Sequence, residues 1–84
     1  MSDPSTKRVA LFGGSFDPPH IGHTAFCAAL AEDQDNDAIW VLPSANHPFG
    51  KKMAPFALRK EMCRIAFTPL SPKVEIRDDE LRLQ

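Results

Sequence analysis

The sequence predicts an α/β fold with a parallel sheet, built as β-α-β-α-β with strand order 3-2-1. Residues 8–12 and 38–42 are short, continuous apolar runs, which are typical of parallel strands covered on both faces. Residues 22–33 and 55–67 have helical spacing and separate the predicted strands. Right-handed crossovers then place three strands in one sheet, which is one half of a Rossmann-like fold.

Composition and charge exclude several classes of protein. The chain has 84 residues, 43% hydrophobic and 25% charged, as expected of one small globular domain. Its net charge of −1 argues against a sequence-independent nucleic-acid binder. No apolar run approaches the ~20 residues of a membrane span, and residues 1–7 lack an apolar signal region. We therefore expect a cytoplasmic protein without nucleic-acid or membrane partners, with a disordered tail over 1–7 and a folded part over 8–84.

The turn after the first strand, residues 13–23, is the centre of the predicted site. A strand that enters a helix through glycines presents backbone N–H groups and the positive end of the helix dipole. Gly13 and Gly14 allow a tight turn or the close approach of a ligand. His20 and His23 lie at the same turn. The residues therefore indicate a site for a phosphorylated ligand.

The first helix, 22–33, is expected to turn one face to the sheet. That face carries His23, Phe26, Cys27 and Leu30. His23 is thereby placed near the end of the first strand. Cys27 and Cys63 form no CxxC pair and are expected to be buried, reduced thiols.

An acidic segment, 32–37, follows this helix. A cation site is one interpretation, but a solvated turn is favoured because acidic residues at a helix C-terminus are unfavourable. Pro43 ends the second strand. Alternating residues at 73–77 predict an edge strand.

The second helix, 55–67, begins at Pro55, which suits the first position of a helix. Its inward face is expected to carry Leu58, Met62, Ile65 and Ala66. Arg59 and Arg64 on this helix are expected to face solvent.

The stretch 13–23, which reads Gly-Gly-Ser-Phe-Asp-Pro-Pro-His-Ile-Gly-His, resembles the signature of the HxGH nucleotidyltransferase superfamily. Within it, the chain most resembles bacterial nicotinate or nicotinamide mononucleotide adenylyltransferases. The resemblance covers residues 8–77 and only the first half of that family's domain. It implies transfer of AMP from ATP to a pyridine mononucleotide in NAD biosynthesis, by an incomplete, truncated chain.

The resemblance also implies roles for individual residues. His20 and His23 would contact the triphosphate and stabilise charge on the transferred phosphoryl group. The nucleotide would be bound by Gly13, Gly14, Ser15, Phe16 and Gly22. Mg²⁺ would be bound through the ATP phosphates, and no protein metal site is expected. The loop 46–52 resembles the family's Pro-Pro-His-Lys loop and would bring His47 and Lys51 to the mononucleotide, although a solvated Lys51 is the alternative.

The residues alone leave alternatives open. The two histidines can also be a packing histidine and a cap, or metal ligands together with Asp17 or His47. A Walker A loop and a GxGxxG motif are absent, and Ser15 lacks a GxSxG context.

Two other functions compete with pyridine mononucleotide adenylyl transfer. One is transfer to phosphopantetheine or CTP-dependent transfer within the same superfamily. The other is nucleotide binding without turnover, since the family's later arginine-containing motif does not occur here. Because the first strand would have an open edge, self-association through it is also expected.

Overall fold

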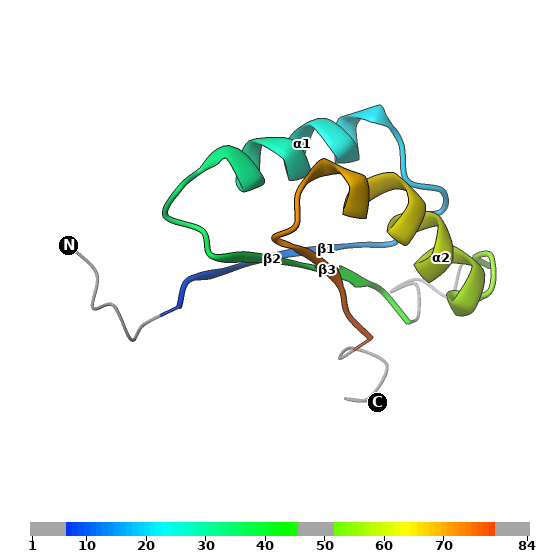
Figure 1. The fold of residues 1–84 in the computed structure, drawn as a ribbon. Helices are drawn as coiled ribbons and strands as arrows, with labels where there is room; N and C mark the ends of the chain where they lie inside the picture. Colours follow the sequence, from blue (N-terminus) through cyan, green and yellow to red (C-terminus); the bar gives the residue numbers. More distant parts are fainter. Residues whose placement is uncertain (1–6, 46–51, 79–84) are drawn as a thin grey trace.

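The computed structural model describes residues 7–45 and 52–78 and confirms the α/β layer (Figure 1). Its strands are β1 (Val9–Gly14), β2 (Ala38–Pro43) and β3 (Val74–Ile76). Its helices are α1 (Ile21–Glu32) and α2 (Phe56–Phe67), and a 3₁₀ turn, η1 (Thr68–Leu70), follows α2. The strands are parallel, in the order β1-β2-β3. Counted from the opposite edge of the sheet, this is the predicted order 3-2-1, with β2 between β1 and β3.

The first strand is longer than the sequence predicts. Gly13 and Gly14 belong to β1, where they pair with Leu42 and Pro43 of β2. The Ser44 N–H continues this ladder by donating to the Gly14 carbonyl at 2.8 Å. A prediction based on apolar side chains stops before the glycines, whereas strand pairing uses only the backbone.

Both helices cover the same face of the sheet (Figure 1). Ile39, Val41 and Pro43 of β2 point to this face and are buried, whereas Trp40 alternates to the other face and is only half-buried. Leu11 of β1 is 64% exposed. The expectation that both faces of the strands are covered is therefore wrong for the described part of the chain. The Arg77 guanidinium partly shields the open face, 4.0 Å from the centroid of the Trp40 ring.

Helix α1 lies over the sheet largely as predicted. Cys27 is completely buried, and His23 and Leu30 are half-buried. Phe26 is at the margin of the core, with half of its surface exposed and its ring 5.0 Å from that of Phe12.

Helix α2 turns a different face to the core from the one predicted. Its buried residues are Arg59, Cys63 and Phe67, while Leu58 and Ile65 are exposed. Each buried residue comes directly after a position of the predicted face at 58, 62 and 66, so the helix is rotated by one residue, or ~100°. The prediction is wrong because it excluded a charged residue from the core. Arg64 is exposed, as predicted.

The two cysteines are buried and free, which confirms the expectation for both. Burial raises the pKa of the Cys27 thiol. Burial also raises the pKa of Cys63 to about 11, against the opposing charge of Arg59. The segment between α1 and β2 is an exposed turn except for Asn36, whose side chain donates to the Leu30 carbonyl at 2.9 Å. Over the described ranges, no helix is both long and apolar enough to cross a bilayer.

Candidate functional site

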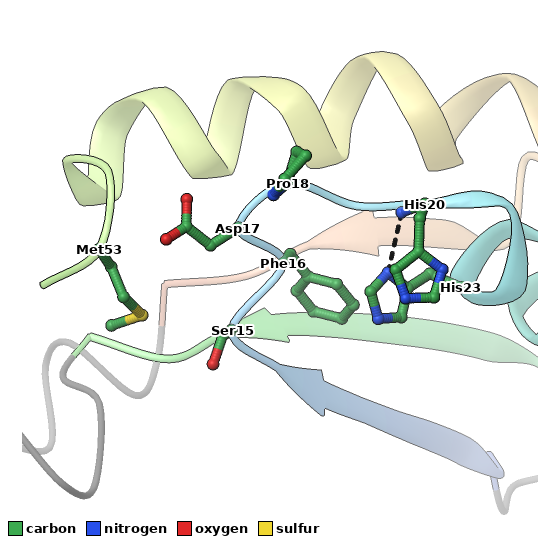
Figure 2. A pocket seen from close by; sticks show the side chains of 7 residues that line it. All are labelled: Ser15, Phe16, Asp17, Pro18, His20, His23 and Met53. Carbon is green, nitrogen blue, oxygen red and sulfur yellow. Dashed lines mark hydrogen bonds between the residues drawn. The ribbon is translucent and has the colours of Figure 1, made fainter. Parts of the chain in front are cut away.

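A cavity of about 350 Å³ opens beside the turn that joins β1 to α1 (Figure 2). Its lining residues are Ser15, Phe16, Asp17, Pro18, His20, His23 and Met53. The two histidines lie together at the start of α1, and Met53 lies across the turn from them (Figure 2). Parallel α/β sheets commonly bind ligands beyond the carboxyl ends of their strands, and this cavity begins directly after β1.

The two histidines together cap α1. His20 is the residue before the helix, and its Nδ1 accepts a hydrogen bond from the Gly22 N–H at 3.1 Å. In return, the His20 N–H donates to Nδ1 of His23 at 3.0 Å. This is a capping box in which imidazoles occupy both side-chain positions. The rings stack with their centroids 3.7 Å apart and their planes 26° apart.

The capping bonds fix the proton positions on both rings. An Nδ1 that accepts a hydrogen bond carries no proton, so the neutral imidazole holds its proton on Nε2. His20 and His23 therefore each have an Nε2–H donor that the cap does not use. Both rings line the cavity together with the Asp17 side chain, so two imidazole donors are available there to an anion.

The surroundings of His23 favour its neutral form. Its ring packs edge-on against Phe16, with centroids 4.9 Å apart, and lies 6.2 Å from the ring of Phe12. Burial lowers the pKa of His23, and the charge of His20 lowers it further. In the neutral form Nδ1 accepts the hydrogen bond of the cap while Nε2–H stays a donor.

The first turn of α1 does not present its N–H groups in the way that the sequence suggested. The Gly22 N–H is engaged by the His20 ring, and the N–H groups of His23 and Thr24 donate to the His20 carbonyl at 2.9 and 3.1 Å. His20 thus satisfies the N–H groups of Gly22 and His23, two donors of the first turn, and the Thr24 N–H makes the first regular hydrogen bond of the helix. The imidazole Nε2–H groups are the donors that the site offers instead.

Packing explains why Gly14 and Gly22, on either side of the turn, have no side chain. A Cβ at Gly22 would lie 2.9 Å from Cε1 of His20, so a larger residue would push the ring out of its capping position. A Cβ at Gly14 would lie 3.2 Å from the Phe16 ring. At Gly13 the nearest atom would be the Leu42 carbonyl oxygen at 3.8 Å, which is ordinary contact.

Phe16, rather than a glycine, has the left-handed backbone conformation in this turn, with φ of 48°. Its side chain is only 2% exposed and packs edge-on against Phe12 and Phe67 at centroid distances of 5.2 and 5.4 Å. The ring therefore forms the floor of the cavity and joins it to the core.

Arg59 is the residue that the sequence interpretation assigned to solvent and that the structure buries, at 1% exposure. Its Nε donates to the Ala54 carbonyl at 2.8 Å. One terminal nitrogen, Nη1, donates to the carbonyls of Ser15 at 2.9 Å and Ser44 at 2.7 Å. Arg59 thus reaches the loop that lines the cavity. The sequence signal for the burial of Arg59 is its position four and eight residues before Cys63 and Phe67, on the same face of the helix.

The structure describes only some of the remaining residues that the sequence assigned to the site. Ser15 lines the cavity, whereas His47 and Lys51 lie outside the described residues. Met53 was missed, because nothing in its local sequence points to a site. The Asp17 carboxylate accepts a long hydrogen bond of 3.3–3.4 Å from the Ala54 N–H and so joins the turn to the segment before α2.

Comparison with known proteins gives consistent similarities. Residues 11–83 match the family model described as cytidylyltransferase-like. The chain is 52% identical over 56 residues to a probable nicotinate-nucleotide adenylyltransferase of Myxococcus xanthus, covering 67% of this chain and 30% of that protein. It is 45% identical over 74 residues to a protein of the same description from Sulfurimonas denitrificans, covering 87% of this chain and 40% of that protein.

Among solved structures, the fold is similar to Plasmodium falciparum nicotinic acid mononucleotide adenylyltransferase, solved in complex with NaAD. The TM-score is 0.76 at 23% identity, covering 87% of this chain and 37% of that chain, which shows a shared fold. The chain spans between about a third and two fifths of the length of the proteins it matches.

Proposed function

This chain belongs to the cytidylyltransferase-like family, and on that basis we propose that it acts in the transfer of AMP from ATP to nicotinate mononucleotide, in cytoplasmic NAD synthesis. The observation that carries the proposal is the stacked His20–His23 pair, which brings two Nε2–H donors to one cavity. The descriptions of the bacterial relatives support the choice of nicotinate mononucleotide as acceptor.

The chemistry needs donors more than it needs a base. A phosphate oxygen of the mononucleotide forms a bond to the α-phosphorus of ATP, the bond from that phosphorus to the bridging oxygen breaks, and pyrophosphate leaves. The attacking oxygen is already anionic, so catalysis rests on positioning and on charge stabilisation. We assign the Nε2–H groups of His20 and His23 to the phosphate oxygens on which charge develops.

We propose that Mg²⁺ binds at this site through the phosphates of the nucleotide. Within the part of the chain that the structure describes, no three His, Cys, Asp or Glu side chains form a group that could hold a metal ion. A hard cation of this kind is commonly held mainly through phosphates and water. Mg²⁺ bound to ATP would neutralise phosphate charge, while the histidines supply directed hydrogen bonds. His47 and Lys51 stay the proposed contacts to the mononucleotide.

A binding experiment separates the role of His23 in the ligand site from its role as a cap. We expect His23→Gln to keep the cap, because glutamine is a usual third residue of a capping box. It removes the imidazole Nε2–H, and loss of one hydrogen bond to a charged group weakens binding by about 10- to 100-fold. Calorimetric titration with Mg-ATP should show this loss, while exposed Lys52→Ala binds nearly as the wild type does. Equal affinity in wild type and His23→Gln would remove His23 from the site.

An activity assay separates the competing functions. Dinucleotide formation is measured with ATP and nicotinate mononucleotide, with nicotinamide mononucleotide as the second acceptor. Phosphopantetheine with ATP, and an alcohol phosphate with CTP, are the controls for other members of the superfamily. Turnover with a control substrate alone would contradict the proposal, and Mg-ATP binding without any turnover would assign these 84 residues to nucleotide binding only.

We also propose that the chain associates with itself through β1. This strand is at the edge of the described sheet, and its Leu11 is 64% exposed. An apolar edge strand is prone to pair with another chain. Sedimentation velocity should show a dimer or larger species that Leu11→Lys shifts toward monomer, and a wild-type monomer at micromolar concentration would overturn this proposal.

A further inference from the structure

Arg59 is a buried cation with an unusual set of partners. The described ion pairs involve Arg8, Lys60, Arg64 and Arg77, and none includes Arg59. Within the described ranges, its guanidinium is hydrogen-bonded to three backbone carbonyls, at 2.7–2.9 Å. Burying a charge is costly unless it is well paired, and carbonyl dipoles compensate it without cancelling it.

The three carbonyls belong to three separate segments. Ser15 directly follows β1, Ser44 directly follows β2, and Ala54 lies just before α2, next to Met53. These residues are 44, 15 and 5 positions from Arg59 in the sequence. Only a planar guanidinium has several donors at fixed angles, so a lysine at this position cannot hold all three segments at once.

The segments that Arg59 joins are those that surround the cavity. Ser15 and Met53 line it, and the Ser15–Asp17 turn leads into the two capping histidines. The Asp17 carboxylate adds a second, weaker connection to Ala54, at 3.3–3.4 Å. The hydrogen bond from the Ser44 N–H to the Gly14 carbonyl closes the same junction from the strand side.

We propose that Arg59 is a positioning residue for the ligand site, acting through the Ser15 and Ser44 carbonyls on the turn that carries His20 and His23. Its guanidinium fixes this turn against the loops after β2 and before α2, and its positive charge, which no described ion pair cancels, is held beside Ser15, a lining residue of the cavity. The part that concerns the nucleotide rests on the proposed function. The part that concerns the turn rests on the hydrogen bonds alone.

The test uses the full 84-residue chain and three variants. Arg59→Lys keeps the positive charge but lacks the planar set of guanidinium donors. Arg64→Lys is the matched control on the exposed side of α2. Val74→Ala is the stability control, because it weakens the core at β3 without touching the cavity lining. Each variant is compared by Mg-ATP titration below its unfolding midpoint, by ¹⁵N NMR of the histidine rings, and by hydrogen exchange of the Ser44 amide.

We expect Arg59→Lys to weaken Mg-ATP binding at least tenfold, to change the Nδ1 signals of both histidines, and to speed exchange of the Ser44 amide. Arg64→Lys should change none of these, and Val74→Ala should lower the unfolding midpoint alone. A folded Arg59→Lys with unchanged histidine signals and Ser44 exchange would overturn the inference. Loss of affinity in Val74→Ala as large as in Arg59→Lys would reduce Arg59 to a stabilising residue and also overturn it.

The inference can still be tested if the wild type does not bind Mg-ATP or if Arg59→Lys does not fold. If wild type fails to bind Mg-ATP, the proposed function fails, while the ligand-free histidine and Ser44 signals still decide whether Arg59 positions the turn. If Arg59→Lys does not fold, the guanidinium Nε–H signal of wild-type Arg59 is followed during Mg-ATP titration. A shift in that signal supports the inference, and an unchanged signal while the histidine signals shift contradicts it.

Discussion

Helices α1 and α2 have the same length, follow the carboxyl ends of neighbouring strands and lie on the same face of the sheet, but they begin in opposite ways (Figure 1). Helix α1 begins at the surface, where two imidazoles close its first turn and also line the cavity. Helix α2 begins at Phe56, after Pro55, with no side-chain cap, and its first turn carries the buried Arg59. One helix start turns its imidazoles to the cavity, and the other holds the backbone around them.

The difference lies in how far each set of contacts reaches along the chain. The His20–His23 cap is made within three residues, so it depends only on the local sequence and on Gly22. The Arg59 contacts extend to Ser15, 44 residues away, so they exist only in the folded sheet. Substitutions near the His20–His23 cap should therefore alter the cavity with little effect on the fold, whereas loss of the Arg59 contacts should lower the stability of the whole fold.

The largest expected effect comes from Arg59→Met. Methionine approximates the size of the arginine stem but leaves three carbonyls without their donor. The loss should be about 3 kcal/mol or more in the free energy of unfolding, which is a large share for a domain of this size. Urea unfolding followed by circular dichroism measures it.

The control for this change is Arg64→Met. Arg64 is exposed and, among the described residues, pairs only with Glu61, one helical turn earlier, so no measurable loss is expected. Equal destabilisation by the two substitutions would mean that the buried contacts of Arg59 contribute no more than an exposed ion pair.

A smaller effect on stability but a clear effect on the site is expected from Gly22→Ala. The new Cβ displaces the His20 ring and removes a cap, which lowers the free energy of unfolding by about 1 kcal/mol. Alanine favours the helix over glycine by about 1 kcal/mol, so the two effects on stability nearly cancel. The Nδ1 signal of His20 should nevertheless change, and Mg-ATP affinity should fall about tenfold, as expected when a hydrogen bond to a charged group is lost. NMR and calorimetric titration measure the two quantities.

Gly13→Ala is the matched substitution on β1, where the added carbon meets only the Leu42 carbonyl at ordinary contact distance. The His20 signal should therefore not change. A loss of affinity in Gly13→Ala with unchanged histidine signals would show that a ligand approaches the strand backbone there.

The smallest expected effect is the pH dependence that His23 gives to stability. Its pKa is lowered in the folded protein from 6.5, so the unfolded chain binds the proton more tightly. The stabilising contribution is therefore complete above about pH 6.5 and is lost as the pH falls through the lower, folded-state pKa. Unfolding midpoints between pH 5 and 8 should fall toward acid in wild type and less steeply in His23→Gln. Parallel curves would show that protonation of His23 is not linked to folding.

The sequence predicts those structural features that depend on residues close together in the chain. The positions of the three strands, the two helices and the buried cysteines follow from local apolar patterns, and the turn at His20 and His23 follows from a contiguous motif. The end of β1 at Gly14 was missed because a glycine carries no side chain to show strand pairing.

The inward face of α2 was missed for a different reason. An arginine in the core is stable only where several acceptors meet, and the acceptors on Ser15 and Ser44 are brought to Arg59 by the sheet. No window of sequence around Arg59 contains them. The spacing to Cys63 and Phe67 gave a weak signal that the charge of Arg59 outweighed.

The use of both Nδ1 lone pairs by the cap also makes the histidine pair slow to react with electrophiles. In the neutral ring with its proton on Nε2, the nucleophilic lone pair is the one at Nδ1, so an acylating agent can react only after the helix cap opens. The rate of acylation therefore reports how often the start of α1 opens. Diethyl pyrocarbonate should modify His20 and His23 more slowly than a free histidine, and Mg-ATP should protect both rings further.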